Sequence, residues 1–201
     1  LMAIKAANDK SMSNITALPS GVNAKSMILL ATETASSSAT IDFTSGIDST
    51  YKEYVFKFID IHPATNNVQF QVNFRDGSTA YDATKTSTFF YAYHNEGGTA
   101  TALSYDTGSD IAQGTGVQTI VLGQGNGNDE SCSGTLHLYD PSNTTFIKHF
   151  MTRISFYQHN NYAFDNFTAG YCNVTAAIDG VQFSMSSGNI DAGTIKMYGV
   201  V

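Results

Sequence analysis

The chain has 201 residues, a formal net charge of −7 and only 13% charged residues, about half the roughly 25% of an ordinary globular domain. The acidic balance argues against a nucleic-acid-binding protein, which needs a basic surface, and no window approaches the roughly 18 apolar residues of a membrane span. Hydrophobic residues at 42% and aromatic residues at 12% exceed what a disordered chain carries, so a packed core is expected.

Residues 1–26 are predicted to form an extended arm. Their apolar residues follow neither a helical nor a strand period, and such a segment gains order by lying on another surface. We expect an attachment arm that makes contact through Ile4, Ile15 and Leu18. The first residues also lack the basic region and apolar core of a signal peptide, so export by that route is not expected.

Alternating patterns begin after the arm. In residues 68–74 Val and Phe alternate with polar residues, the pattern of a half-buried strand. In residues 54–61 aromatic residues occupy one face, and Val55, Ile59 and Ile61 occupy the other. Apolar residues on both faces predict a central strand that is covered on both sides.

Further strands are predicted where runs with a period of two are separated by turn residues. Their expected ranges are 27–32, 40–43, 88–94, 117–122, 134–139, 145–157, 181–185 and 195–201. Residues 140–143, Asp-Pro-Ser-Asn, predict a type I turn with proline in its second position, and hence a hairpin. No segment keeps a helical period between caps, so no helix longer than a turn or two is expected.

These elements predict an all-β fold. Roughly eight to ten strands with frequent turns favour a two-sheet antiparallel β-sandwich of jelly-roll type over a small barrel. We expect the N-terminal arm followed by one sandwich domain over residues 27–201. The long irregular stretches 76–85, 95–115 and 123–131 are expected at the ends of the sandwich, where such domains meet partners.

The two cysteines, Cys132 and Cys172, are forty residues apart and match no zinc-binding spacing. We expect two buried thiols, and a single bridge between neighbouring strands remains as the alternative.

Two pairs of residues are candidate cation ligands. His94 with Glu96, and Asp129 with Glu130, could supply nitrogen and oxygen atoms from loops. The five histidines, however, show no ligand spacing along the chain. We therefore expect no metal site.

Catalytic patterns are equally weak. Asp60 and His62 could form an acid and base pair, but no nucleophile elbow accompanies them. The glycine-rich segment 123–128 lacks the Lys-Ser/Thr ending of a phosphate-binding loop. We expect no catalytic residues and no cofactor, and we expect the protein not to be an enzyme.

Aromatic residues are more numerous than one sandwich core needs. Tyrosines flanked by Asn, Ser and Gly provide contact area and hydrogen bonds at low entropic cost, so they suit the binding of sugars or proteins. The segment 157–162 best fits this description. Its predicted surface patch consists of Tyr157, His159, Asn160, Asn161 and Tyr162.

Three segments resemble virion structural proteins of tailed bacteriophages, the group common in phages of marine bacteria. They are ATIDFTSGIDSTYKEYVF at 39–56, GNDESCSGTLHL at 127–138 and GTIKMYGV at 193–200. The resemblance spans about residues 27–201. It implies a structural role in a virion, and it assigns no catalytic residues.

From the resemblance and the single arm we expect a capsid decoration or cement protein on the particle surface, assembled in the host cytoplasm. The alternative is a tail-fibre or receptor-binding, lectin-like protein that recognises host surface polysaccharide; a polysaccharide depolymerase ranks third. Expected partners are other virion proteins, either the major capsid protein or tail proteins, and further copies of the chain, a trimer among the forms considered. A host glycan is a partner under the alternative interpretation, and neither nucleic acid nor membrane insertion is expected.

Overall fold

The computed structural model describes residues 26–201, and in this range it contains twelve strands and no helix. The all-β prediction is confirmed. The strands are β1 (Met27–Thr34), β2 (Thr40–Phe43), β3 (Glu53–Pro63), β4 (Val68–Arg75), β5 (Lys85–Asn95), β6 (Thr101–Tyr105), β7 (Gln118–Gln124), β8 (Cys132–Tyr139), β9 (Lys148–Gln158), β10 (Tyr162–Cys172), β11 (Gly180–Met185) and β12 (Ile190–Val200). The predicted arm contacts Ile4, Ile15 and Leu18 lie outside the described residues.

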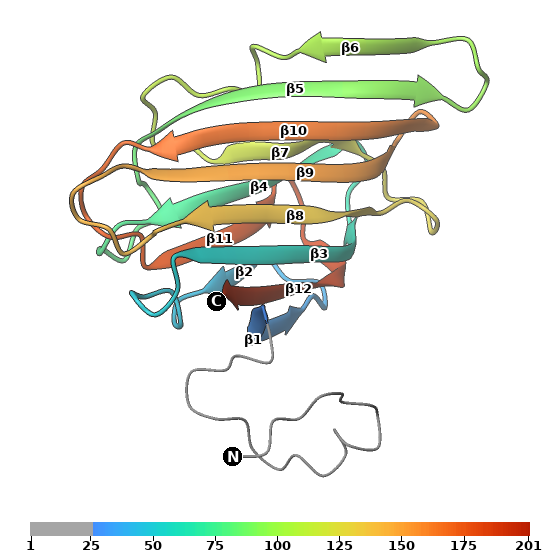
Figure 1. The fold of residues 1–201 in the computed structure, drawn as a ribbon. Coiled ribbons are helices and arrows are strands. Elements are labelled where there is room, and N and C mark those ends of the chain that lie inside the picture. Colours follow the sequence, from blue (N-terminus) through green and yellow to red (C-terminus); the bar gives the residue numbers. More distant parts are fainter. Residues whose placement is uncertain (1–25) are drawn as a thin grey trace, which may run out of the picture.

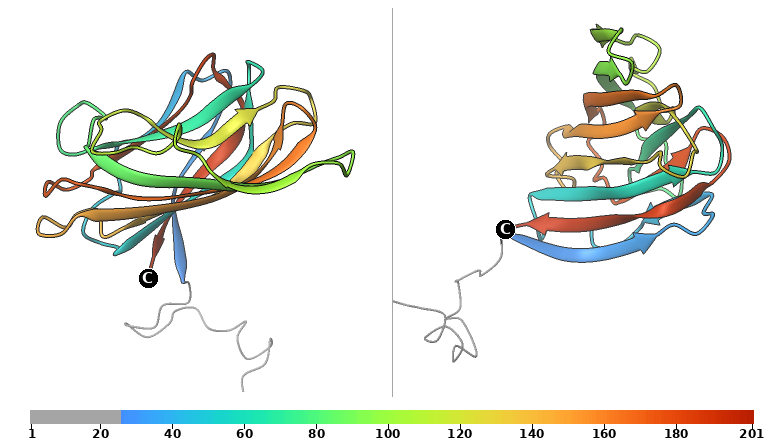
Figure 2. Two further views of the ribbon diagram at one scale, coloured as in Figure 1. Left: turned by 90° about the horizontal axis from the view of Figure 1, so that it is seen from above. Right: turned by 90° about the vertical axis from the view of Figure 1, so that its right-hand side faces the viewer.

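All strand pairs are antiparallel, and the sheet branches at β9 (Figure 1). One branch continues from β1-β12-β3-β8-β9 through β10 and β5 to β6. The other, β7-β4-β11-β2, joins β9 through the single pair Gln124 and Gln158. A further bridge between Ser38, which precedes β2, and Ile190 of β12 brings this branch back to the first, so the sheet nearly closes into a barrel-like shape (Figure 2).

The core lies between the two branches and is built from aromatic rings. Phe183 of β11 lies 5.2 Å from Phe58 of β3 and 5.8 Å from Phe70 of β4, measured between ring centroids. Phe74 of β4 meets Phe150 of β9 at 5.0 Å. The alternation predicted for residues 68–74 is confirmed, because the Val and Phe side chains of β4 are buried.

One prediction for β3 is wrong. Val55 is buried as expected, but Ile59 is 39% exposed, and Ile61 is fully buried with the aromatic residues rather than on the opposite face. The cause is a β-bulge between Phe58 and Ile61, where Asp60 adopts a φ of 51°. A bulge inserts an extra residue and shifts the following side chains to the other face.

Two strands were missed by the sequence prediction. β6 lies inside the stretch 95–115 that was expected to be irregular, and β10 follows the predicted strand 145–157 without having been recognised. β6 is short and rich in small residues, whereas β10 buries Asn166 and Thr168 on its inner face. These polar residues interrupt the apolar alternation on which the prediction relied.

The predicted hairpin between β8 and β9 is confirmed. The Asn143 N–H donates to the Asp140 carbonyl at 3.0 Å, which closes the turn that contains Pro141. Both cysteines are buried and free, so the expectation of two thiols is also confirmed. They lie on different strands, Cys132 at the start of β8 and Cys172 at the end of β10.

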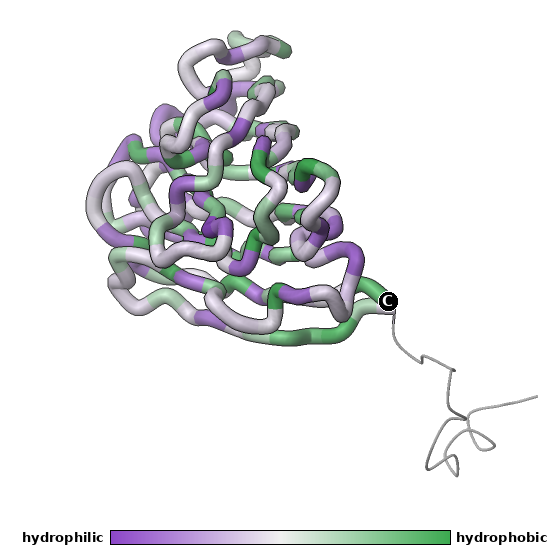
Figure 3. The backbone as a smooth tube through the Cα atoms, turned by 90° about the vertical axis from the view of Figure 1, so that its left-hand side faces the viewer, coloured by the Kyte–Doolittle hydropathy of each residue, from purple (hydrophilic) through white to green (hydrophobic). Residues whose placement is uncertain are grey.

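Strands β10, β5 and β6 extend the sheet beyond the barrel-like body (Figures 1 and 2). In the body the inward side chains of β3 and β8 are buried, whereas Tyr91, Tyr93 and Phe164 of the extension are only half-buried. At the opposite end, β1 pairs with β12 alone among the described strands and forms a hydrophobic stretch along the lower edge (Figure 3). β1 and β6 therefore each have one edge without a strand partner in this part of the chain.

Candidate functional site

The turn between β9 and β10 carries the five residues of the predicted patch: Tyr157, His159, Asn160, Asn161 and Tyr162. The Asn161 N–H donates to the Gln158 carbonyl at 2.9 Å, and Asn161 adopts a φ of 65°, a left-handed conformation that asparagine tolerates well. The hairpin brings these residues close together, but their side chains do not share one face.

Tyr157 lies on the outer face of the hairpin. Its hydroxyl donates to Oε1 of Glu96 at 3.0 Å and lies 3.3 Å from Oδ1 of Asn161. The hydrogen bond to the Glu96 carboxylate raises the pKa of Tyr157, and the charges of Asp129 and Glu130 act in the same direction. The surroundings of the turn are therefore acidic.

His159 ties the turn to strand β7. Its Nδ1 lies 3.1 Å from the carbonyl oxygen of Gly123, and its Nε2 lies 2.9 Å from Nδ2 of Asn160. A proton on Nδ1 lets Nδ1 donate to the carbonyl and Nε2 accept from the Asn160 amide. Nε2 of Gln158, which lies 2.7 Å from the same Nδ1, is also a donor and would need the other tautomer. His159 thus holds Asn160 in position.

Tyr162 faces inward and helps to line a recess of about 210 Å³, together with four other residues. We call this the aromatic recess; it consists of Tyr93, Gln158, Asn160, Tyr162 and Phe164. Tyr93 and Phe164 were not part of the predicted patch, because they are distant from each other in sequence. The register of β5 and β10, which places Phe164 opposite Tyr93, brings them together.

The rings of the aromatic recess are packed against one another and against the core. Phe164 lies 5.1 Å from Tyr93 in a stacked arrangement and 5.2 Å from Phe156. Tyr162 stands at 77° to Tyr93, with their centroids 5.4 Å apart. The stacked rings of Tyr93 and Phe164 therefore form the base of the recess, and the ring of Tyr162 forms one side of it.

The opposite side of the extension, here named the outer face, is apolar and exposed. It carries Leu103, Tyr105, Phe90, Phe167 and Met151 on β6, β5, β10 and β9. Leu103 is 74% exposed, and Phe90 stacks on Phe167 with centroids 4.7 Å apart. Exposed apolar surface that is continuous across several strands is typical of interaction sites.

The charges on the outer face neutralise each other. The guanidinium of Arg153 donates to both carboxylate oxygens of Asp165, and its Nη2 lies 2.8 Å from Oδ2. The same guanidinium covers the ring of Phe167 at 5.1 Å. The centre of the outer face is therefore neutral, whereas at its edge the Tyr105 hydroxyl donates to the carboxylate of Asp110 at 2.6 Å.

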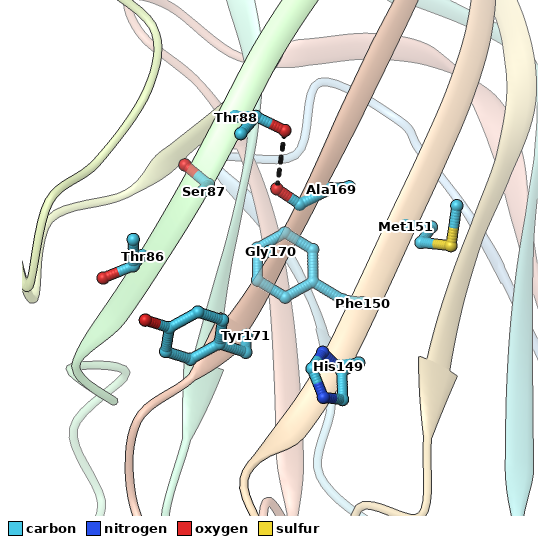
Figure 4. A pocket seen from close by; sticks show the side chains of 9 residues that line it. All are labelled: Thr86, Ser87, Thr88, His149, Phe150, Met151, Ala169, Gly170 and Tyr171. Atoms are coloured by element: carbon cyan, nitrogen blue, oxygen red, sulfur yellow. Dashed lines mark hydrogen bonds between the residues drawn. The ribbon is translucent and has the colours of Figure 1, made fainter.

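A groove of about 380 Å³ crosses the outer face over β5, β10 and β9 (Figure 4). The middle of the groove is formed by two small residues, Thr88 and Ala169, which lie opposite each other. The rings of Phe90 and Phe167 border it at one end, and those of Tyr171 and His149 border it at the other end. The centroids of Tyr171 and His149 are 6.1 Å apart. The groove is thus a consequence of small residues placed between two rows of rings.

The structure does not join Asp60 and His62 into a catalytic pair. His62 Nε2 lies 3.1 Å from the carbonyl oxygen of Gly127, and Nδ1 lies 3.6 Å from a carboxylate oxygen of Asp191. Asp60 sits at the bulge of β3, where its N–H donates to Oγ of Ser133. These contacts hold loops in place.

Asp129 and Glu130 line one recess of about 390 Å³ together with Asp60 and His62. No hydrogen bond or ion pair joins these four side chains to one another among the described residues. Glu96 receives the Tyr157 hydroxyl, and Glu130 folds over the glycine-rich segment, where it accepts a hydrogen bond from the Gly127 N–H. Residues 26–201 contain no group of three or more His, Cys, Asp or Glu side chains that could hold a metal ion.

In the described part of the chain there is no helix of the length and apolar character needed to cross a membrane. No known family model matches the chain, and no curated protein is detectably similar to it.

Proposed function

We propose that the protein is a non-enzymatic structural component of a bacteriophage particle, most specifically a capsid decoration protein. The resemblance of residues 27–201 to tailed-phage virion proteins suggests the particle. The outer face suggests how the domain associates. A decoration protein binds its neighbours through contacts between surfaces and needs no catalytic site. We also propose that the fold is the jelly-roll sandwich expected from the sequence, with β7-β4-β11-β2 as its second sheet.

The observation that carries this proposal is the open edge at β6, where the outer face ends. Among residues 26–201, β6 pairs only with β5, and residues 97–105 contain no charged side chain. Proteins usually protect exposed edge strands with charges, proline or bulges, since an unprotected edge pairs with another strand. An unprotected edge beside an apolar face favours a protein that works in an assembly.

The particle assignment predicts where the protein is found. Gold-labelled antibody against the chain is expected to decorate the heads of purified particles in electron micrographs, at many positions per head. Label confined to the tail would instead favour the receptor-binding alternative. Absence of label from both head and tail, with a labelled major capsid protein as the positive control, would contradict a virion role.

The edge assignment predicts self-association. Two β6 strands that pair antiparallel around Leu103 place Thr101 opposite Tyr105 of the second copy and bring no like charges together. In analytical ultracentrifugation we expect the native chain to form oligomers, and Leu103→Lys to raise the dissociation constant at least tenfold. Phe146→Lys is the matched control, because Phe146 is 70% exposed but lies outside β6. Equal oligomerisation of the two variants would refute pairing through β6.

A second candidate function, receptor binding at the host surface, is favoured by the aromatic recess. Half-buried rings beside side-chain amides form the kind of site that holds a small polar ligand with apolar faces. This candidate corresponds to the tail-fibre or lectin-like alternative expected from the sequence.

A further inference from the structure

Within the aromatic recess, the rings leave their polar ends free. The hydroxyls of Tyr93 and Tyr162 make no hydrogen bond to any other residue among those described. Both tyrosines are half-buried, with an apolar ring body and a polar tip. These two hydroxyls, on the neighbouring strands β5 and β10, therefore offer donors and acceptors to a ligand.

The amide rim of the recess is fixed in position before any ligand arrives. Oε1 of Gln158 accepts the Asn160 N–H at 2.9 Å, and the Asn160 side chain is held by His159. Oδ1 of Asn160 has no hydrogen-bond donor among the described residues. A polar group that is already hydrogen-bonded and keeps a free acceptor can orient a ligand at reduced entropic cost.

Charge restricts the class of ligand. The five residues that line the recess are uncharged. Tyr157 in the same hairpin has its pKa raised by carboxylates of two loops, first Glu96 after β5 and then Asp129 and Glu130 between β7 and β8. An anionic ligand would enter a negative field without a cation to bind it. The chemistry favours a neutral, hydroxyl-rich ligand.

The size of the recess restricts the class of ligand further. The recess of about 210 Å³ is smaller than the roughly 300–1,000 Å³ of pockets that enclose a drug-sized molecule. One sugar ring is compatible with this space, with further units extending into solvent. The apolar C–H face of a pyranose can lie on the rings of Tyr93 and Phe164, while its hydroxyls reach the amides and the tyrosine hydroxyls.

We propose that the aromatic recess binds one neutral pyranose unit of a polysaccharide. The inference rests on the second candidate function and gives it a ligand class. It does not depend on the decoration role, since a protein on the capsid could carry the same site. Labelling of particles and binding of sugars are separate measurements, so either proposal can fail without the other.

The test uses the full chain and saturation-transfer NMR with free sugars. Glucose, galactose, mannose and N-acetylglucosamine represent neutral ligands, glucuronic acid represents anionic ones, and choline tests the rings as a cation cage. We expect transfer to at least one neutral sugar and weaker transfer to glucuronic acid and choline. No neutral binding, or preferential binding of glucuronic acid or choline, would overturn the proposal.

Variants assign the binding to the recess. Tyr93→Ala is expected to weaken binding of the neutral sugar about tenfold, the order of effect that loss of one aromatic contact produces, whereas Tyr93→Phe should retain the stacking and most of the affinity. Asn160→Ala removes the amide from an exposed turn residue, so it should weaken binding several-fold without affecting the fold. Tyr105→Ala on the outer face is the matched control and should bind as the native chain does. Equal binding by all four variants would place the sugar elsewhere and refute the site.

Discussion

Replacement of Phe183 by alanine is expected to lower the free energy of unfolding by about 3–5 kcal/mol, the usual cost of removing a large buried aromatic side chain. Phe183 is fully buried, and its ring contacts Phe43, Phe56, Phe58 and Phe70 at centroid distances of 6.2, 5.6, 5.2 and 5.8 Å. These partners come from β2, β3 and β4. The ring therefore joins the two branches of the sheet, and the cavity left by alanine cannot be filled by one neighbour alone.

Chemical denaturation measures this effect, since the midpoint should fall while the dependence on denaturant stays the same. Phe146→Ala is the control, because its side chain is 70% exposed and its loss should change stability by less than about 0.5 kcal/mol. A loss below about 1 kcal/mol for Phe183→Ala would mean that the two branches do not share one core.

The body of the fold could be predicted from the sequence because its strands obey the simple alternation of apolar and polar residues. β4 shows this most clearly, with buried Val and Phe side chains at every second position. The turn at Pro141 was also predictable, because proline and asparagine determine it locally. Local patterns were sufficient where burial followed hydrophobicity.

The extension was harder to predict because burial there does not follow hydrophobicity. β10 buries Asn166 and Thr168, while β6 exposes Leu103 and Tyr105. The bulge at Asp60 posed a similar problem, since one residue with a positive φ changes which side chains face inward. In each case a distant strand, rather than the local sequence, determines the environment of the residue.

The candidate site was predicted only in part for the same reason. Asn160 and Tyr162 are close in sequence and were predicted as members of one surface patch. Tyr93 is distant in sequence and joins them through the pairing of β5 with β10. The surplus of aromatic residues was the available signal. It could show that some rings are exposed, but it could not show which rings meet.

Two buried lysines flank a buried thiol across three strands. Lys85 of β5 and Lys148 of β9 both lie opposite Cys172 of β10, and all three side chains are fully buried. Nζ of Lys85 donates to the carbonyl of Gly116 at 2.7 Å, and Nζ of Lys148 donates to that of Val174 at 2.7 Å. Each lysine thus fastens a loop to the sheet, at the cost of burying a charge.

This burial predicts how stability depends on pH. Burial lowers the pKa of Lys85 to about 8 from an ordinary value of 10.5, so between these values the unfolded chain binds more protons than the folded chain. Stability contributed by this residue therefore rises with pH in that window. Burial also raises the pKa of Cys172 to about 12. This thiol lowers stability once it ionises in the unfolded chain near pH 9. A variant of Lys85 is therefore needed to separate the effect of the lysine from that of the thiol.

Lys85→Met is the variant that isolates it, and the quantity to measure is the difference in unfolding free energy between the variant and the native chain. Each unit by which folding lowers the pKa corresponds to 1.36 kcal/mol. At neutral pH the buried, charged Lys85 therefore lowers the free energy of unfolding by about 3 kcal/mol relative to the same side chain in its uncharged form. We expect the difference to shift by about 1 kcal/mol in favour of the native chain between pH 7.5 and pH 9. Lys52→Met, at an exposed lysine paired with Asp140, is the control for the removal of one positive charge. A constant difference for Lys85→Met would mean that water reaches this lysine and that the loop at Gly116 is not closed over it.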